Sequence, residues 1–147
     1  MKRILSITTA LVMTLGTTFA APTNGNDHDN ITASFRKEFQ QAQIISTEAG
    51  SNYTKLTFKM NGAVMFAFYS TSGELLAITH NITSDQLPLQ LLLQLKHNYN
   101  DYWISDLFEC DTNGSSTYYI TLETADQKLT LRSSDNQWET YSRSSKI

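Results

Sequence analysis

The fold is decided by one stretch of the sequence, Leu87-Pro88-Leu89-Gln90-Leu91-Leu92-Leu93-Gln94-Leu95-Lys96-His97-Asn98-Tyr99. This leucine-dense segment predicts a helix, and its proline is tolerated because it falls in the first turn. Alternating apolar and polar segments, separated by turn-forming residues, lie on both sides of it. With an earlier helix, the order helix, strands, helix, strands predicts an α+β protein. We expect two helices packed on one face of a curved antiparallel β-sheet.

The leucine-dense helix carries apolar side chains on more than one flank. One flank can pack against the sheet, and the other flank allows two interpretations. Either the helix is buried between the sheet and the first helix, or Leu89 and Leu93 stay exposed as an association surface. Trp138, in the last predicted strand, is a further candidate for such a surface.

The first half of the chain predicts one helix and three strands. Phe35, Phe39 and Ala42 recur at helical spacing in a helix over 31–45, and residues 46–52 are expected to turn. Strands are expected over 53–60, 63–69 and 74–82, where apolar and polar residues alternate.

The length of the turn at Asn61-Gly62 decides which side chains of this first half face the core. A two-residue turn places Phe58 on the face of Met65, whereas a three-residue loop places it opposite Val64. Burying one large apolar side chain contributes about 1.5–3 kcal/mol. We therefore predict three-residue loops, because they collect on one face Leu56, Phe58, Val64, Phe66, Phe68, Leu76 and Ile78.

The same register leaves the opposite side of the sheet free of helices. The side chains expected there are Tyr53, Lys55, Lys59, Met65, Tyr69 and Leu75, with the small Ala63 and Ala67 between them. Aromatic anchors beside small residues suit the docking of a protein or peptide. An ordinary solvated sheet face with a few apolar groups is the other interpretation.

The second half predicts four more strands. They are expected over 102–110, 117–123, 128–133 and 138–141, and residues 143–147 are expected to fray. No tract suits a flexible linker, so we predict a single domain over 31–142.

The N-terminus is typical of a secretory signal peptide. Lys2 and Arg3 precede an uncharged, largely apolar run that ends in Thr18-Phe19-Ala20. We predict cleavage between Ala20 and Ala21, a periplasmic or secreted mature chain, and no membrane insertion of that chain. Residues 21–30 lack apolar periodicity and are expected to be disordered.

The charge of the chain argues against two classes of partner. The sequence has 11 basic and 14 acidic residues, for a net charge of −3, and the signal peptide removes two basic residues, which leaves −5. Nucleic acids and anionic membrane surfaces both require a basic face. Cys110 is the one cysteine, so an intramolecular disulfide is impossible. A lone thiol is most often a buried small residue, and an intermolecular disulfide is the alternative interpretation.

No sequence motif points to catalysis, a metal or a cofactor. The three histidines, His28, His80 and His97, do not form a metal-binding pair in sequence. We predict a non-enzymatic binding or inhibitor-like module with an unidentified protein or peptide partner. The alternatives are a self-associating cell-envelope protein and a small hydrolase. A pocket that holds His80 within hydrogen-bonding reach of a carboxylate would favour the hydrolase.

Several landmarks together resemble the PepSY-like proteins of bacterial periplasms. They are Phe35-x3-Phe39-x2-Ala42, Asn52-Tyr53-x4-Phe58-x2-Asn61-Gly62, Phe68-Tyr69-x3-Gly73-Glu74-Leu75, Leu87-Pro88, His97-Asn98-Tyr99 and Thr117-Tyr118-Tyr119-Ile120. Such proteins are similar in fold to the repeat of the β-lactamase inhibitory protein, in which helices pack on one face of an antiparallel sheet. Ser46 departs from the pattern, since these sequences often carry a Trp near that position. The resemblance implies a small extracytoplasmic binding or inhibitory module and supplies no active site.

Overall fold

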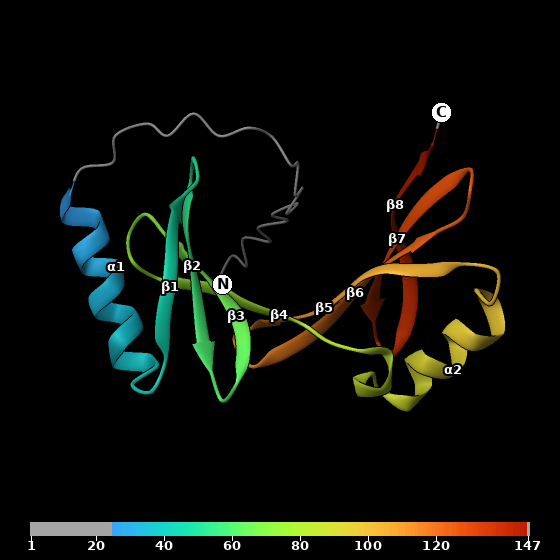
Figure 1. Cartoon of the computed structure of the whole chain (residues 1–147), viewed down its shortest axis with the longest axis horizontal. Coiled ribbons are helices and arrows are strands. Elements are labelled where there is room, and N and C mark those ends of the chain that lie inside the picture. Colours follow the sequence, from blue (N-terminus) through green and yellow to red (C-terminus); the bar gives the residue numbers. More distant parts are fainter. Residues whose placement is uncertain (1–24, 147) are drawn as a thin grey trace, which may run out of the picture.

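The computed structural model describes residues 25–146, which form one continuous eight-stranded antiparallel sheet with two α-helices (Figure 1). Each strand pairs with the next in the chain, and the α+β class is confirmed. The elements are α1 (Gly25–Glu38), β1 (Gln43–Ala49), β2 (Tyr53–Met60), β3 (Ala63–Ser70), β4 (Leu75–Asn81), the 3-10 turn η1 (Ser84–Gln86), α2 (Leu89–Asn98), β5 (Trp103–Thr112), β6 (Ser115–Glu123), β7 (Gln127–Ser134) and β8 (Gln137–Ser145). The expected signal peptide and its cleavage site lie outside the described residues.

The first helix begins and ends earlier than the sequence predicts. It starts at Gly25, so the described part of the segment 21–30 is helical, and it ends at Glu38. The residues that follow form the edge strand β1, where the β-branched Ile44, Ile45 and Thr47 favour extended backbone. A bulge between Ile44 and Ser46 interrupts the alternation of side chains, which hides this strand from a periodicity argument.

The hairpin between β2 and β3 has a two-residue turn, and the predicted three-residue loop is wrong. Met60 pairs with Ala63, and Phe58 pairs with Met65. Asn61 and Gly62 adopt φ angles of 51° and 84°, the left-handed conformations that a tight hairpin turn requires. Because side chains alternate along a strand, this register moves Phe66 and Phe68 to the face opposite Phe58.

Helix α1 covers the first half of the sheet. Its Phe35 ring and the Phe58 ring of β2 are fully buried, with centroids 4.9 Å apart in an edge-to-face arrangement. The buried residues of this first cluster are Ile31, Phe35, Leu56, Phe58, Ala67 and Tyr69.

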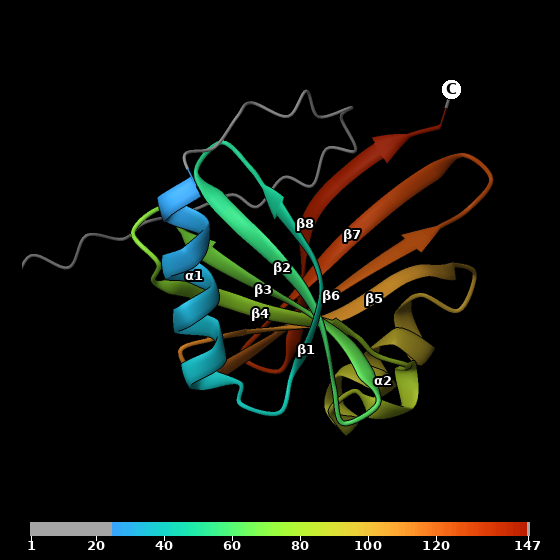
Figure 2. The same ribbon diagram turned by 60° about the vertical axis from the view of Figure 1, so that its left-hand side comes forward.

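Helix α2 covers the second half, at the other end of the sheet from α1 (Figures 1 and 2). It is therefore not wedged between the sheet and the first helix. The Trp138 indole Nε1–H donates a 3.0 Å hydrogen bond to the Leu91 carbonyl and ties α2 to β8. The buried residues of this second cluster are Ile82, Leu87, Leu95, Leu107, Ile120, Leu122, Leu129 and Leu131.

Both helices lie on the same face of the sheet. Cross-strand pairs link Met65 to His80, His80 to Glu109 and Glu109 to Tyr118, and residues paired in this way point to one side. Leu107 precedes Glu109 by two residues and shares its side of β5. The first and second clusters therefore occupy one face, which we call the helix face, and the opposite side is the open face.

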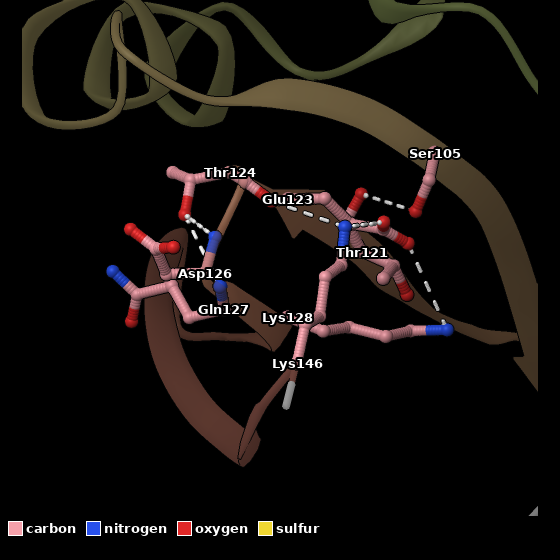
Figure 3. Close-up of polar contacts among 8 residues, drawn as sticks. All are labelled: Ser105, Thr121, Glu123, Thr124, Asp126, Gln127, Lys128 and Lys146. Carbon is pink, nitrogen blue, oxygen red and sulfur yellow. Dashed lines mark hydrogen bonds and ion pairs between the residues drawn. The ribbon is translucent and has the colours of Figure 1, made fainter.

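The last strand extends further than expected. Residues 143–145, predicted to fray, belong to β8, and Lys146 is tied to the β6–β7 turn (Figure 3). Its backbone N–H donates to Asp126 O at 2.8 Å, and its ammonium donates to Thr124 O at 3.0 Å and pairs with the Glu123 carboxylate. Hydrogen bonds from Lys146 and then Ser105 lower the pKa of the Glu123 carboxyl.

Candidate binding face

The open face carries aromatic side chains on both halves of the sheet. The cross-strand register places Phe66 opposite Thr57 and Phe108 opposite Tyr119 on this side. The aromatic residues of the face are Tyr53, Phe66 and Phe68 in the first half, and Trp103, Phe108, Tyr119 and Tyr141 in the second half.

The first aromatic group is partly covered by its own neighbours. The Tyr53 ring lies 5.7 Å from the Phe68 ring, and Lys55 is paired across the strands with Phe68. Phe68 is only 5% exposed as a result. The Lys55 ammonium lies 5.4 Å above the Phe66 ring and also pairs with the Glu48 carboxylate at 3.1 Å. These contacts hold a cation over the face of a half-buried ring.

The second aromatic group is a stack at right angles to a third ring. Phe108 and Tyr119 stack with centroids 5.1 Å apart, and Tyr141 meets Tyr119 edge-on at 5.6 Å. Arg132 is the cross-strand partner of Tyr119, and its guanidinium lies 3.4 Å from the Glu139 carboxylate. Burial raises the pKa of the Tyr119 phenol, so this group offers a neutral hydroxyl near neutral pH.

Small side chains separate the two aromatic groups. Thr79 of β4 is paired with Cys110 of β5, and Phe66 is paired with Thr79. Cys110 is half-buried, and burial raises the pKa of its thiol, which favours the protonated form. On the open face, the small side chains of Thr79 and Cys110 therefore lie between the two aromatic groups.

The structure divides the predicted binding residues between the two faces. Tyr53, Lys55 and Lys59 lie on the open face, since they alternate with the buried Leu56 and Phe58. The other three were placed on the wrong side, because their positions depended on the predicted turn. Residues on the helix face are Met65, Tyr69 and Leu75, which pack with the first cluster.

Tyr69 is fully buried, and its hydroxyl lies 3.4 Å from the Glu38 carboxylate. Burial, followed by repulsion from Glu38, raises the pKa of Tyr69 above its ordinary value. Above about pH 10 the unfolded chain releases this proton while the folded chain retains it. The unfolded state then binds fewer protons, so the free energy of unfolding falls as pH rises.

We expect Tyr69→Phe to flatten this alkaline loss of stability, which reaches about 1.4 kcal/mol per pH unit for one group. Urea unfolding at a series of pH values between about 9 and 11.5 measures the slope. At pH 7 the variant should differ from the parent by about 1 kcal/mol or less, because only one long hydrogen bond is lost. Equal alkaline slopes for the two proteins would contradict the assigned environment of Tyr69.

The proposed association residues also fall into two classes. Leu89 and Leu93 are 68% and 52% exposed, on the side of α2 that faces away from the sheet. Trp138, in contrast, is half-buried and packs against the second cluster. Only the two leucines therefore form an exposed apolar pair.

Sequence reasoning missed the aromatic residues of the second half and those of β3. In β5 the sequence did contain a signal, because Phe108 directly follows the buried Leu107 and neighbouring side chains of a strand point to opposite faces. In β8 it was absent, because a bulge places Tyr141 out of register with its neighbours.

The polar cluster around His80 lies on the helix face. His80 Nε2 is 3.6 Å from Glu109 Oε2, too long for a hydrogen bond, and Tyr118 donates to Glu109 at 3.4 Å. Two clefts, of about 470 and 370 Å³, lie beside Leu91 and beside Glu38, and His80 lines neither.

Among residues 25–146, no group of three His, Cys, Asp or Glu side chains could hold a metal ion. Within the same range, no helix has the length and apolar character that crossing a bilayer requires.

No protein-family model matches the sequence, and no curated protein sequence matches it. Solved structures do match in fold. A BLIP-like protein from Bacteroides fragilis NCTC 9343 superposes with a TM-score of 0.68 at 15% identity, over 86% of this chain and 89% of that protein. The fold is similar to that of a β-lactamase-inhibitor-like protein.

Two other solved structures share this architecture. A DUF2874 family protein from Bacteroides ovatus ATCC 8483 has a TM-score of 0.69 at 15% identity, over 85% of this chain and 89% of its own. A protein described as periplasmic, from Bacteroides eggerthii DSM 20697, has a TM-score of 0.69 at 14% identity, over 80% and 87%. At such identities the likeness concerns the fold alone. None of these proteins is named for an enzymatic activity.

Proposed function

We propose that this chain is an extracytoplasmic module that binds a protein or peptide through its open face. One observation supports this above the others: the aromatic rings of both halves lie on a sheet face that neither helix covers. Large aromatic side chains dominate the energetics of protein interfaces. The BLIP-like neighbour gives the proposal its inhibitor-like aspect. Tyr53, Lys55 and Lys59 stay in the proposed site, joined by Phe66, Phe108 and Tyr141.

The periplasmic location is part of the same proposal. It is supported by the signal-peptide pattern, with cleavage between Ala20 and Ala21, and by the fold neighbour described as periplasmic. A relationship to the PepSY-like proteins is proposed on the sequence landmarks alone. The mature domain of the proposal extends from the start of α1 to Lys146.

The proposal assigns no catalytic residue. A hydrolase would need His80 held by a carboxylate in a pocket, whereas His80 and Glu109 are 3.6 Å apart and line neither cleft. The 3.6 Å separation is too long for the hydrogen bond by which a carboxylate orients a catalytic histidine. This geometry favours a binding module over the hydrolase.

Self-association is the second candidate function. The exposed pair Leu89 and Leu93 supports it, because two leucines one helical turn apart can pack against the same pair in a second copy. Light scattering of the mature chain over a range of concentrations tests this candidate, and a constant monomer mass would contradict it.

We expect the double variant Phe66→Ala/Tyr141→Ala to lose at least ten-fold in partner capture from periplasmic extract, since hot-spot truncations cost about 2 kcal/mol or more. Both side chains are partly exposed, so the fold should persist, and a thermal melt checks this. The matched control is Leu89→Ala/Leu93→Ala, which removes apolar surface from α2 and should leave capture unchanged. If the control loses the partner and the open-face variant retains it, the binding site lies on α2 instead.

A further inference from the structure

The two halves of the sheet are joined by a short strand ladder. The β4–β5 ladder has four residue pairs, from Ile78–Asp111 to Asn81–Phe108, whereas the β3–β4 and β6–β7 ladders have five each and the β5–β6 ladder has nine. One more hydrogen bond, from Ile82 N–H to Leu107 O at 3.1 Å, continues it. Few backbone bonds therefore hold the halves together.

The apolar core is also divided at this ladder. Ile78 packs with the first cluster, whereas Ile82 and Leu107 belong to the second cluster. Between them the helix face carries the partly exposed polar residues His80 and Glu109, and the helices lie at the two ends of the sheet (Figure 1). Among residues 25–146, no buried apolar cluster joins β4 (Leu75–Asn81) to β5, and the second cluster reaches only Ile82, the residue after β4.

We propose that the two halves are separate cooperative units and that the β4–β5 ladder is a hinge between them. Opening a segment costs free energy in proportion to the apolar surface and backbone bonds that it exposes. Separation of the four ladder pairs leaves Ile82 packed against Leu107 and exposes neither cluster, so it requires less free energy than unfolding of either half. The open face crosses the hinge, with Phe66 on one side and Phe108 on the other. Bending would change the spacing of the two aromatic groups.

Native-state hydrogen exchange of the whole mature chain tests the independence of the halves. Leu131→Ala removes a fully buried side chain from the second cluster, and Leu56→Ala does the same in the first. We expect Leu131→Ala to lower the protection of the β6 and β7 amides about 100-fold while the β2 and β3 amides change by less than about two-fold. Leu56→Ala should give the reverse pattern. An equal loss in both halves from either variant would overturn the proposal.

A disulfide across the ladder tests the hinge itself. The bond from Ile82 to Leu107 marks a hydrogen-bonded position, so Thr79 and Cys110, three positions away on each strand, form a non-hydrogen-bonded pair. Cα atoms of such pairs are about 4.5 Å apart, within the range of natural disulfides. Thr79→Cys should therefore form a bridge with the native Cys110 on oxidation, and reduction restores the unbridged chain.

Oxidised Thr79→Cys should slow exchange of the His80 amide at least ten-fold relative to the same protein when reduced, because His80 and Glu109 form a hydrogen-bonded pair inside the ladder. Thr79→Ser, with no thiol at that position, is the matched control and should not respond to oxidant. In the parent chain the His80 amide should exchange at least ten-fold faster than the Ile120 amide of β6. Equal protection of these two amides, or a bridge with no effect on His80, would overturn the hinge. If Thr79→Cys does not fold, the exchange patterns of Leu131→Ala and Leu56→Ala still decide whether the two halves are separate units.

Discussion

Replacing Phe58 by alanine should lower the free energy of unfolding by about 3–5 kcal/mol. The ring is fully buried between β2 and α1, with centroids 4.9 Å from Phe35 and 5.3 Å from Phe39. Truncation removes this aromatic cluster's central member and leaves a cavity that α1 can fill only by moving. Urea unfolding followed by far-UV circular dichroism measures the change.

Val64→Ala is the control, and together with Phe58→Ala it tests the register of the β2–β3 hairpin. Val64 is 46% exposed on the open face, so its truncation should cost about 0.5 kcal/mol or less. The three-residue loop would have placed Val64 and Phe58 side by side in the core. A loss of 1 kcal/mol or more in Val64→Ala would contradict the two-residue turn.

The position of this hairpin could be predicted from the sequence, but its length could not. Asn61-Gly62 marks the turn because both residues tolerate left-handed backbone. The choice of length rested on collecting large apolar side chains on one face. That argument assumes that only one face excludes water, whereas Phe68 is buried on the open face beneath Tyr53 and Lys55. When both faces of a sheet bury aromatic rings, the number of large apolar side chains collected on one face cannot decide which register is correct.

The candidate site was predictable only where it did not depend on the turn. Tyr53, Lys55 and Lys59 could be placed from the alternation within β2 itself, whose other side meets α1. Residues of β3 change face with a one-residue change in the loop, which explains the misplacement of Met65 and Tyr69. Bulges in β5 and β8 have the same effect on the second half, and short bulges leave no reliable mark in a sequence.

The packing partner of α2 also could not be predicted from the sequence. The density of leucines predicts that one side of α2 is buried, but it does not indicate which surface covers that side. The structure seats α2 on the second half through Trp138, and Gln94 reinforces this contact. The Gln94 amide donates to Asn136 O at 2.9 Å and accepts from the Trp138 backbone N–H at 3.3 Å. These partners lie more than 40 residues apart in the chain, beyond any local pattern.

Trp138→Ala should lower the free energy of unfolding by about 3 kcal/mol, at the lower end for tryptophan truncation because the ring is only half-buried. The variant loses packing against the second cluster and leaves the Leu91 carbonyl without its indole donor. Trp138→Phe keeps most of the packing and loses the hydrogen bond, so it should cost about 1 kcal/mol. Urea unfolding of both variants separates the two contributions.

Trp103→Ala is the matched control, because Trp103, the chain's other tryptophan, is 51% exposed. Among the aromatic and cation–π pairs of residues 25–146, the Trp103 ring takes part in one, with the Lys146 ammonium 4.8 Å from its centroid. Its truncation should cost less than about 1 kcal/mol. If Trp103→Ala costs as much as Trp138→Ala, the seat of α2 is not the feature that distinguishes the two rings. If Trp138→Phe costs as much as Trp138→Ala, the single bond to Leu91 outweighs the packing. Either result would show that packing of the Trp138 ring against the second cluster is not what anchors α2.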